Sequence, residues 1–568
     1  MVNIMIEPFW TPIKSELLTK NAYSENFLGD GDATIEWKNE NRPLDIFIHT
    51  KSYEIFKQKD RLYLFGQRGS GKTAMMNMLL YEVKRKRVKD YGYAWLVDQE
   101  EAYCNLSIHL RSSQFSDYSH QELVHIMKKG WEWLIYISAM ASIVKGRYQS
   151  DKDDKDLTVI INYLRTNRLL EDDSIKFREN FLHRISENII QNIDKFEKKD
   201  IYSNLNSNFK SGIYILEIIN SLLFTTNYDS AKKALLRILN KLRVPCLVMI
   251  DSKELYSLND RIEQAGNTAL IEVAMEFYKQ ESIHHILVKV AFPSEFSSKL
   301  IVPNKEKMLN KSMYILWTYR DIVCFIAKRY MWLIEKSRTT EDIKRLDNFS
   351  VAQHYLYKHL PEKIPYGDYV VFDTMAYIIR HTHKKPRQVI SLFNAILSFA
   401  KEEKNDISKI SSSIIIKGIH SNLDELVNGC LNMYTQIYPK ADEIVKRGLH
   451  GTKSYIDYSE LDKRLKEVSS LRAEFQLSSE DVKRLLLECG VLGIQKSRSD
   501  LHNQKIALVE ALFEYQVKDK LTITNKDTCV IHPMFYEPLE ICIDANSLVY
   551  PKPAEDEEIK IYSSIGRV

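Results

Sequence analysis

Residues 66–73 read Gly66-Gln67-Arg68-Gly69-Ser70-Gly71-Lys72-Thr73, the complete pattern G-x-x-x-x-G-K-[ST]. The apolar run 62–65 precedes this stretch and a helical pattern, 74–80, follows it. A phosphate-binding loop requires this context, because the glycines let backbone N–H groups and the helix N-terminus converge on an anion. The stretch therefore predicts a nucleoside triphosphate site lined by all eight residues.

Two side chains of the loop carry specific chemistry. Lys72 adds a positive charge for the β- and γ-phosphates, and Thr73 offers a hydroxyl to Mg²⁺. We therefore expect Mg²⁺ and a nucleoside triphosphate as cofactors, Lys72 as a catalytic residue and Thr73 as a metal ligand; the rest of the chain, below, narrows the nucleotide to ATP.

A second apolar run, 246–250, ends in Asp251. Five apolar residues before a carboxylate are typical of a buried central strand whose carboxyl end lies beside the phosphate loop. We predict that Asp251 holds Mg²⁺ through water and takes part in catalysis. A catalytic acid should polarise the attacking water nearby, yet the next residue is Ser252 and not Glu. The nearest substitutes are Glu254 and Asp260, of which Glu254 is our prediction.

The surrounding pattern alternates strands and helices. We expect a lead-in helix over 43–59, and further strands and helices in the ranges 102–108 (strand), 121–145 (helix), 286–292 (strand), 313–317 (strand) and 318–336 (helix). Such alternation predicts an α/β fold with a parallel sheet and crossover helices. Ser294 or Glu295, after the strand 286–292, is placed to sense the γ-phosphate. The loop 294–312 has no arginine, although a ring ATPase commonly puts its arginine finger there.

Composition excludes several classes of protein. The 568 residues are 44% hydrophobic and 27% charged, with a net charge of +4, which is too small to indicate nucleic-acid binding by the whole molecule. Seven scattered cysteines without a C-x-x-C pair favour reduced thiols, and hence the cytoplasm. The N-terminus lacks the pattern of a signal peptide, and the apolar stretch 133–144 is too short to cross a bilayer, so we expect no membrane segment.

The loop, the strand ending at Asp251, the strand ending at Pro293 and the segment 381–388 together resemble AAA+-related and STAND-type P-loop ATPases. Within that group the chain is most similar to bacterial ATPases that resemble Orc-type initiators and KAP-like NTPases, over roughly 25–400. In that family the Pro-Arg step lies in a helical lid, and its arginine reaches the γ-phosphate. The resemblance implies that Arg387 is this catalytic sensor, at the start of a helix over 387–399.

The predicted domains follow from these patterns. They are a lead-in (1–60), an ATPase core (61–149 and 243–335), a helical insertion (150–242), a helical lid (336–450) and a winged-helix-like domain with an acidic tail (451–568). The last domain is expected to have helices over 458–468 and 479–488, then short strands in the ranges 513–516, 521–524 and 529–532, with 525–527 as the hairpin tip. Four basic residues permit DNA contact, and a solvated helix face explains them equally well: Lys483, Arg484, Lys496 and Arg498.

Two functions stay open at this level. One is an ATP-hydrolysing switch that couples nucleotide state to homo-oligomerisation or to binding of DNA or a partner protein, which the resemblance places in bacterial defence. The other is a DNA- or protein-binding adaptor with a structural, slowly hydrolysing ATP site, favoured by the missing Glu after Asp251. A GTPase is disfavoured, because the N-K-x-D signature fails at 525–528, where Thr528 stands in place of the second acid.

Overall fold

The structure is a computed structural model of the chain. It describes residues 26–29, 31–37, 41–98, 119–147, 154–167, 169–170, 226–251, 261–297, 300, 302, 304–335, 337–366, 370–435, 437–500, 507–517, 520–544 and 547–551. These residues form two compact units. The parallel-sheet unit comprises Lys51–Gln67 and Lys72–Ile315, and the C-terminal unit comprises Met1–Thr50, Arg68–Gly71 and Leu316–Val568.

A five-stranded, fully parallel sheet organises the parallel-sheet unit, in the order β2-β3-β4-β1-β5. Its strands are β1 (Tyr63–Gly66), β2 (Tyr93–Asp98), β3 (Cys246–Asp251), β4 (Ile286–Pro293) and β5 (Ser312–Tyr314). Every residue of β1, β3 and β4 is buried, as expected for a parallel sheet covered on both faces. The register pairs Gly66 with Pro293, and Ala291 with Asp251, so the carboxyl ends of these three strands meet at one edge.

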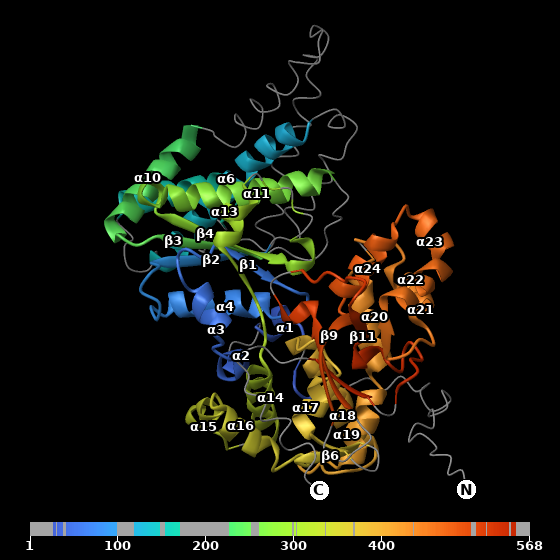
Figure 1. The fold of residues 1–568 in the computed structure, drawn as a ribbon. Helices are drawn as coiled ribbons and strands as arrows, with labels where there is room; N and C mark the ends of the chain where they lie inside the picture. Colours follow the sequence, from blue (N-terminus) through green and yellow to red (C-terminus); the bar gives the residue numbers. More distant parts are fainter. Residues whose placement is uncertain are drawn as a thin grey trace, which may run out of the picture. The chain divides into compact units, whose positions relative to one another are not determined.

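Helices cover both faces of this sheet (Figure 1). Helix α4 (Lys72–Lys84) packs on one face, and α6 (His120–Arg147) and α11 (Arg261–Lys279) pack together on the other. The remaining described helices of the unit are α3 (Lys51–Phe56), α7 (Lys155–Thr166), α10 (Thr226–Leu242), α12 (Glu281–His284), α13 (Lys305–Asn310) and the 3₁₀ turn η4 (Ser294–Phe296). This arrangement confirms the predicted α/β fold class with a parallel sheet.

The stretch that leads into β1 is anchored by a buried lysine of the central strand. Lys289, on β4, donates to three backbone carbonyls, those of Phe56 (2.8 Å), Gln58 (2.8 Å) and Arg61 (2.6 Å). Three residues before Phe56, the Tyr53 hydroxyl donates to the buried carboxylate of Glu82 on α4, at 2.7 Å. These contacts fix the entry to β1, and hence the start of the phosphate loop.

The C-terminal unit is mainly helical in its first part. Its helices are α1 (Ala33–Glu36), α2 (Asn41–Ile46), α14 (Tyr319–Ile334), α15 (Thr340–Arg345), α16 (Phe349–Leu356), α17 (Thr374–Ile379), α18 (Pro386–Glu402), α19 (Ser412–His420), α20 (Leu423–Asn432), α21 (Ala441–Leu449), α22 (Tyr458–Glu467), α23 (Ser469–Glu474) and α24 (Ser479–Glu488). Thr318 and Asp321 form a capping box that starts α14, and Pro386 occupies the first turn of α18, where its missing N–H costs nothing.

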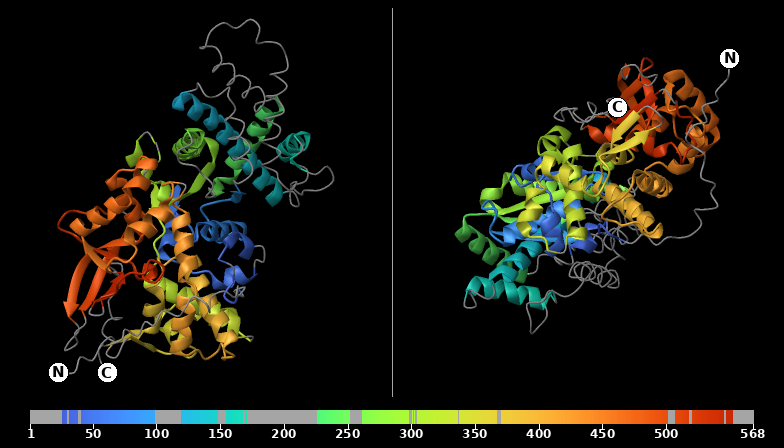
Figure 2. Two further views of the ribbon diagram at one scale, coloured as in Figure 1. Left: turned by 90° about the vertical axis from the view of Figure 1, so that its right-hand side faces the viewer. Right: turned by 90° about the horizontal axis from the view of Figure 1, so that it is seen from below.

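A second sheet lies within this unit, in the order β12-β10-β9-β11-β8. Its strands are β8 (Tyr455–Asp457), β9 (Leu492–Asp500), β10 (Ala507–Phe513), β11 (Thr528–Ile531) and β12 (Ser547–Pro551). The longest pairing among the described strands is the antiparallel one between β9 and β10 (Figure 2). Helices α22 and α24 precede this pair in the chain.

Several predicted elements differ from the observed ones. The lead-in helix 43–59 is two helices, α2 and α3, interrupted at 47–50. The predicted lid contains a short antiparallel pair, β6 (Lys363–Tyr366) and β7 (Val370–Asp373), which was not expected. The predicted strand 102–108 lies outside the described residues, as does most of the helical insertion between α7 and α10.

The predicted hairpin tip at 525–527 is wrong. The hairpin is β9–β10, and residues 521–524 form no strand. We did not predict β9, because its second half, 496–499, is an exposed polar run in which apolar and polar residues do not alternate. Strand β11, which follows the predicted tip, pairs with β9 and β8 instead of with a strand at 521–524.

Candidate functional site

The phosphate loop has the backbone that its glycines predict. Gly69 and Gly71 have φ of +78° and +96°, conformations that side chains strongly disfavour. Helix α4 begins at Lys72, directly after the loop, so its first N–H groups face the loop. The buried Lys72 ammonium donates to the carbonyls of Gly66 (2.9 Å) and Gln67 (3.2 Å), which closes the loop around its own lysine.

Thr73 and Asp251 meet across the edge of the sheet. The Thr73 hydroxyl donates to the Asp251 carboxylate with an Oγ1–Oδ2 distance of 2.5 Å. The two residues are 178 positions apart in sequence, and the register of β1, β4 and β3 brings them together. A hydroxyl and a buried carboxylate in contact are oxygen ligands of the kind Mg²⁺ takes at nucleotide sites.

Ser70 supplies a buried polar atom at the centre of the loop. The residue is 3% exposed, and its hydroxyl has no hydrogen-bond partner among the residues that the structure describes. The backbone carbonyl of the same residue accepts from the indole N–H of Trp317, at 2.8 Å. A buried hydroxyl without a partner is costly, so this residue fits a site that takes a polar ligand such as a phosphate oxygen. The loop residues therefore suit the triphosphate that the motif predicts.

Arg387 lies against the loop within the C-terminal unit. Its backbone N–H donates to the Gly69 carbonyl at 3.3 Å, and its Nε donates to the Gly31 carbonyl at 3.0 Å. A Cβ atom built on Gly69 would lie 2.9 Å from the Arg387 Cβ, closer than ordinary contact. The arginine expected from the Pro-Arg step is thus packed against the phosphate loop itself.

The structure places the other predicted site residues as follows. Gly66 ends β1 and Asp251 ends β3. Gln67 is half-buried and Arg68 is exposed. Ser294 and the buried Glu295 form η4, directly after β4 and against β1. Glu254 lies outside the described residues, so its predicted role as catalytic acid stays a prediction.

The turn before Arg387 is buried against residues that directly follow β10 and β11 of the same unit. The His383 ring stacks on Tyr515 with centroids 4.6 Å apart, and it meets His532 edge-on at 4.8 Å. The His383 backbone N–H donates to the side chain of Gln388 at 2.8 Å. Burial lowers the pKa of both histidines well below the ordinary value, so both rings are neutral at neutral pH.

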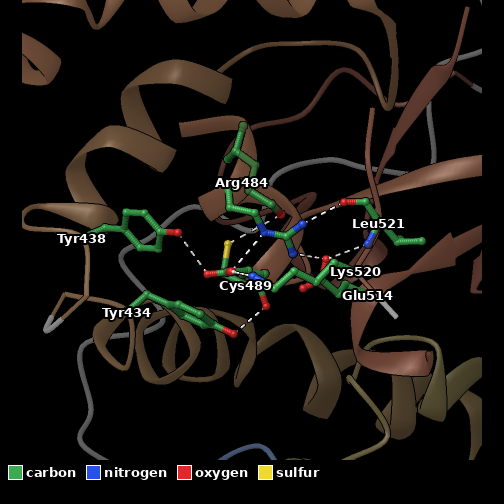
Figure 3. Close-up of polar contacts among 9 residues, drawn as sticks. Tyr434, Tyr438, Arg484, Cys489, Glu514, Lys520 and Leu521 are labelled. Atoms are coloured by element: carbon green, nitrogen blue, oxygen red, sulfur yellow. Dashed lines mark hydrogen bonds and ion pairs between the residues drawn. The ribbon is translucent and has the colours of Figure 1, made fainter. Parts of the chain in front are cut away.

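Two of the basic residues suggested for DNA contact are engaged inside the unit. Lys483 is buried and pairs with Asp462 (2.8 Å) and Glu480 (2.9 Å). Arg484 binds the buried Glu488 at 3.0 Å, contacts Glu514 and donates to the Leu521 carbonyl at 2.7 Å, and Figure 3 shows this network. The Tyr438 hydroxyl also donates to Glu488, at 3.1 Å. These charges are neutralised by their neighbours, whereas Lys496 and Arg498 lie exposed on β9.

Sequence reasoning missed three contributors to this region. Trp317 was included only as the last residue of the predicted strand 313–317, Gly31 only within the lead-in, and Lys289 only within the predicted strand 286–292. The lysine had a detectable signal, since a charged residue inside a buried central strand must find partners. The other two contacts depend on backbone carbonyls, which leave no mark in the sequence.

Within the described residues, no helix combines the length and the apolar character needed to span a bilayer.

Comparison with known proteins finds similar solved structures but no matching family model. No protein-family model and no curated protein matches the sequence. Among solved structures, the chain is similar to the ORC2 protein of Aeropyrum pernix in ADPNP–ADP complexes, with 9% identity, coverage of 85% of this chain and 88% of that chain, and a TM-score of 0.27. It is also similar to CDC6P of Pyrobaculum aerophilum, with 10% identity, coverage of 93% and 99%, and a TM-score of 0.26.

Proposed function

We propose that this protein binds Mg²⁺–ATP at the loop 66–73 and uses the bound nucleotide as a switch. The observation that carries the proposal is the contact of Thr73 with Asp251 beside a closed phosphate loop. A threonine hydroxyl and a strand-end aspartate in contact at the start of the loop helix suit Mg²⁺ together with a triphosphate.

Each group of the site has a separate task in this proposal. Backbone N–H groups of the loop and of the first turn of α4 bind phosphate oxygens, and the Ser70 hydroxyl gains a partner there. Lys72 exchanges its two carbonyl acceptors for phosphate oxygens, because its positive charge is attracted more strongly by a charged oxygen than by a neutral carbonyl. Thr73 and Asp251 hold Mg²⁺, which neutralises phosphate charge when bound.

Hydrolysis is the second part of the proposal. Arg387 stabilises charge that develops on the transferred phosphoryl group, and Glu254 activates the attacking water. Support for Arg387 comes from its packing on Gly69 of the loop. The buried turn 381–385 precedes this arginine and contacts residues that follow β10 and β11, so it offers a path from Arg387 towards the second sheet of the same unit.

A second proposed function is that of an adaptor whose ATP site is structural and hydrolyses ATP slowly. Ser252 follows Asp251 where a catalytic Glu is usual, and this favours the adaptor. For either function we propose a cytoplasmic protein of the Orc-type or KAP-like kind, with a winged-helix-like domain, ATP-dependent self-assembly and a role in bacterial defence. A protein partner is favoured over DNA for the α24 region, because Lys483 and Arg484 are already paired.

The test of nucleotide binding is a titration of purified protein with ATP, with and without Mg²⁺. Lys72→Ala should weaken binding by about tenfold to a hundredfold, since a hydrogen bond to a charged group contributes roughly 1.5–3 kcal/mol. Asp251→Asn should remove most of the Mg²⁺ dependence. Lys84→Ala, at the far end of the same helix, is the matched control and should bind ATP as the wild type does. Wild-type affinity in Lys72→Ala would refute the site.

Phosphate release separates the two functions. For the switch, wild-type protein hydrolyses ATP above background, and Arg387→Ala lowers turnover more than affinity. For the adaptor, ATP binds while turnover stays at background with or without DNA. DNA binding, if it occurs, should weaken steeply with salt, and an affinity that is flat in salt would exclude a phosphate-backbone contact.

A further inference from the structure

A short N-terminal segment is fastened to two helices of the C-terminal unit. We call residues 26–29 and 31–37 the strap, which includes α1. The Leu28 backbone N–H donates to the Asn394 Oδ1 of α18 at 2.9 Å. The Nδ2 of the same asparagine donates to the Gly29 carbonyl at 3.2 Å. Two opposite hydrogen bonds to one buried asparagine fix both the position and the direction of the strap backbone.

The far end of the strap is fastened by a buried ion pair. Arg329 of α14 binds both carboxylate oxygens of Glu36, at 2.7 and 2.8 Å, and also donates to the Leu28 carbonyl at 2.6 Å. The side chains of Arg329 and Glu36 are 6% and 11% exposed. A bidentate guanidinium–carboxylate pair in such a buried setting fixes geometry as well as adding attraction. The strap is therefore held at both ends by side chains of α14 and α18.

Between these two ends, the strap contacts Arg387. The Gly31 carbonyl accepts from the Arg387 Nε at 3.0 Å. A Cβ atom built on Gly31 would lie 2.8 Å from the Arg387 Cγ, and one built on Gly69 would lie 2.9 Å from the Arg387 Cβ. The aliphatic stem of the arginine thus touches two residues that have no side chain, one in the strap and one in the phosphate loop.

We propose that the strap is a positioning element for Arg387, a role that rests on the proposed nucleotide site at 66–73. The Gly31 carbonyl takes the single Nε–H and so fixes the plane of the guanidinium. This leaves the four N–H groups on Nη1 and Nη2 as donors for the γ-phosphate in this proposal. Asn394 and the Arg329–Glu36 pair act through Gly31, because they determine where its carbonyl lies.

The test is a double-mutant cycle on the discrimination between ATP and ADP. The measured quantity is the affinity for a slowly hydrolysed ATP analogue divided by the affinity for ADP, a ratio that needs no turnover. Gly31→Ala adds one methyl group against the flexible stem of Arg387, so the chain is expected to fold. This variant should lower the ratio by about tenfold, or about 1.4 kcal/mol, with little change in ADP affinity. In the Arg387→Ala background it should cause no further loss.

A second variant and a control complete the experiment. Glu36→Gln keeps the shape of the strap but removes its charge, and its smaller loss of discrimination should also vanish without Arg387. Gly429→Ala is the control, because a Cβ there meets no atom within 4 Å, and the ratio should not change. Equal losses for ATP analogue and ADP, or a Gly31→Ala effect that persists in Arg387→Ala, would overturn the proposal.

The outcome also distinguishes this inference from the proposed function. Wild-type protein that binds neither nucleotide contradicts the nucleotide site itself. Wild-type protein that discriminates ATP from ADP through Arg387, while Gly31→Ala keeps the full ratio, contradicts only the strap as a positioning element.

Discussion

A glycine where α19 crosses α18, the helix that carries Arg387, leads to a specific prediction about the packing of these two helices. Gly418, on α19, faces Ile396 on α18, the helix whose second residue is Arg387. The two helices pack closely in the C-terminal unit. A Cβ atom built on Gly418 would lie 2.6 Å from the Ile396 Cα, 3.0 Å from its Cγ1 and 3.1 Å from its backbone N. Two of these three atoms belong to the backbone, so a rotamer change cannot relieve the overlap.

The magnitude for Gly418→Ala follows from two opposing terms. Alanine stabilises a helix interior over glycine by roughly 0.5–1 kcal/mol. Carbon atoms in contact prefer a separation of about 3.5–4.0 Å, so α18 and α19 must move apart by about 1 Å. Such overpacking costs about 1–3 kcal/mol. The overlap exceeds the gain, and the variant should be less stable by about 1 kcal/mol, a factor of about five in the local equilibrium.

The assay is native-state hydrogen exchange followed by mass spectrometry, because a chain of several domains does not unfold in one step. Peptides from α18 and α19 should exchange about five times faster in Gly418→Ala. The matched control is Gly429→Ala in α20, where a Cβ meets nothing within 4 Å and the helix-propensity gain acts alone. That control should slow exchange in its own helix by about two- to fivefold. Unchanged or slower exchange across α18 and α19 in Gly418→Ala would refute the reasoning about this crossing.

Two further predictions concern buried titratable groups. Burial lowers the pKa of Lys289 to about 7, against about 10.4 in an unfolded chain. Between these two pH values the unfolded state therefore binds more protons than the folded state. The free energy of unfolding should rise with pH from 7 towards 10, by up to about 1.4 kcal/mol per pH unit. Native-state hydrogen exchange of β4 peptides at pH 7–9, corrected for intrinsic exchange rates, checks this, and Lys289→Met should lose that rise. Identical pH slopes of stability in the two proteins would mean that the lysine stays charged. The pKa of His383 is lowered well below about 6.5 by burial, so its stabilising contribution is complete above pH 6.5 and falls as the pH drops below it. The same exchange measurement on peptides around His383 at pH 7.5 and 5.5 should show this loss, and His383→Phe should reduce it; the same loss in both would assign the acid sensitivity to other groups.

Much of the parallel sheet was predictable from local sequence. The strands ending at Asp251 and Pro293 are continuous apolar runs, and a fully buried parallel strand requires such runs. The predicted helices 318–336 and 387–399 begin within one residue of α14 and α18, because capping and proline preferences act within one helical turn. The hairpin β9–β10 was missed, since half of β9 faces solvent and its polar side chains carry no period of two.

The sequence by itself determined the phosphate loop, because its function depends on backbone conformations that only glycine adopts easily and on one lysine and one threonine at fixed spacing. Tertiary structure alone decided which distant groups meet that loop. Asp251 reaches Thr73 through the register of three strands, and Arg387 lies between the carbonyls of Gly31 and Gly69. Backbone carbonyls are common to every residue, so a contact that uses them is set by the path of the chain and is invisible in the order of side chains.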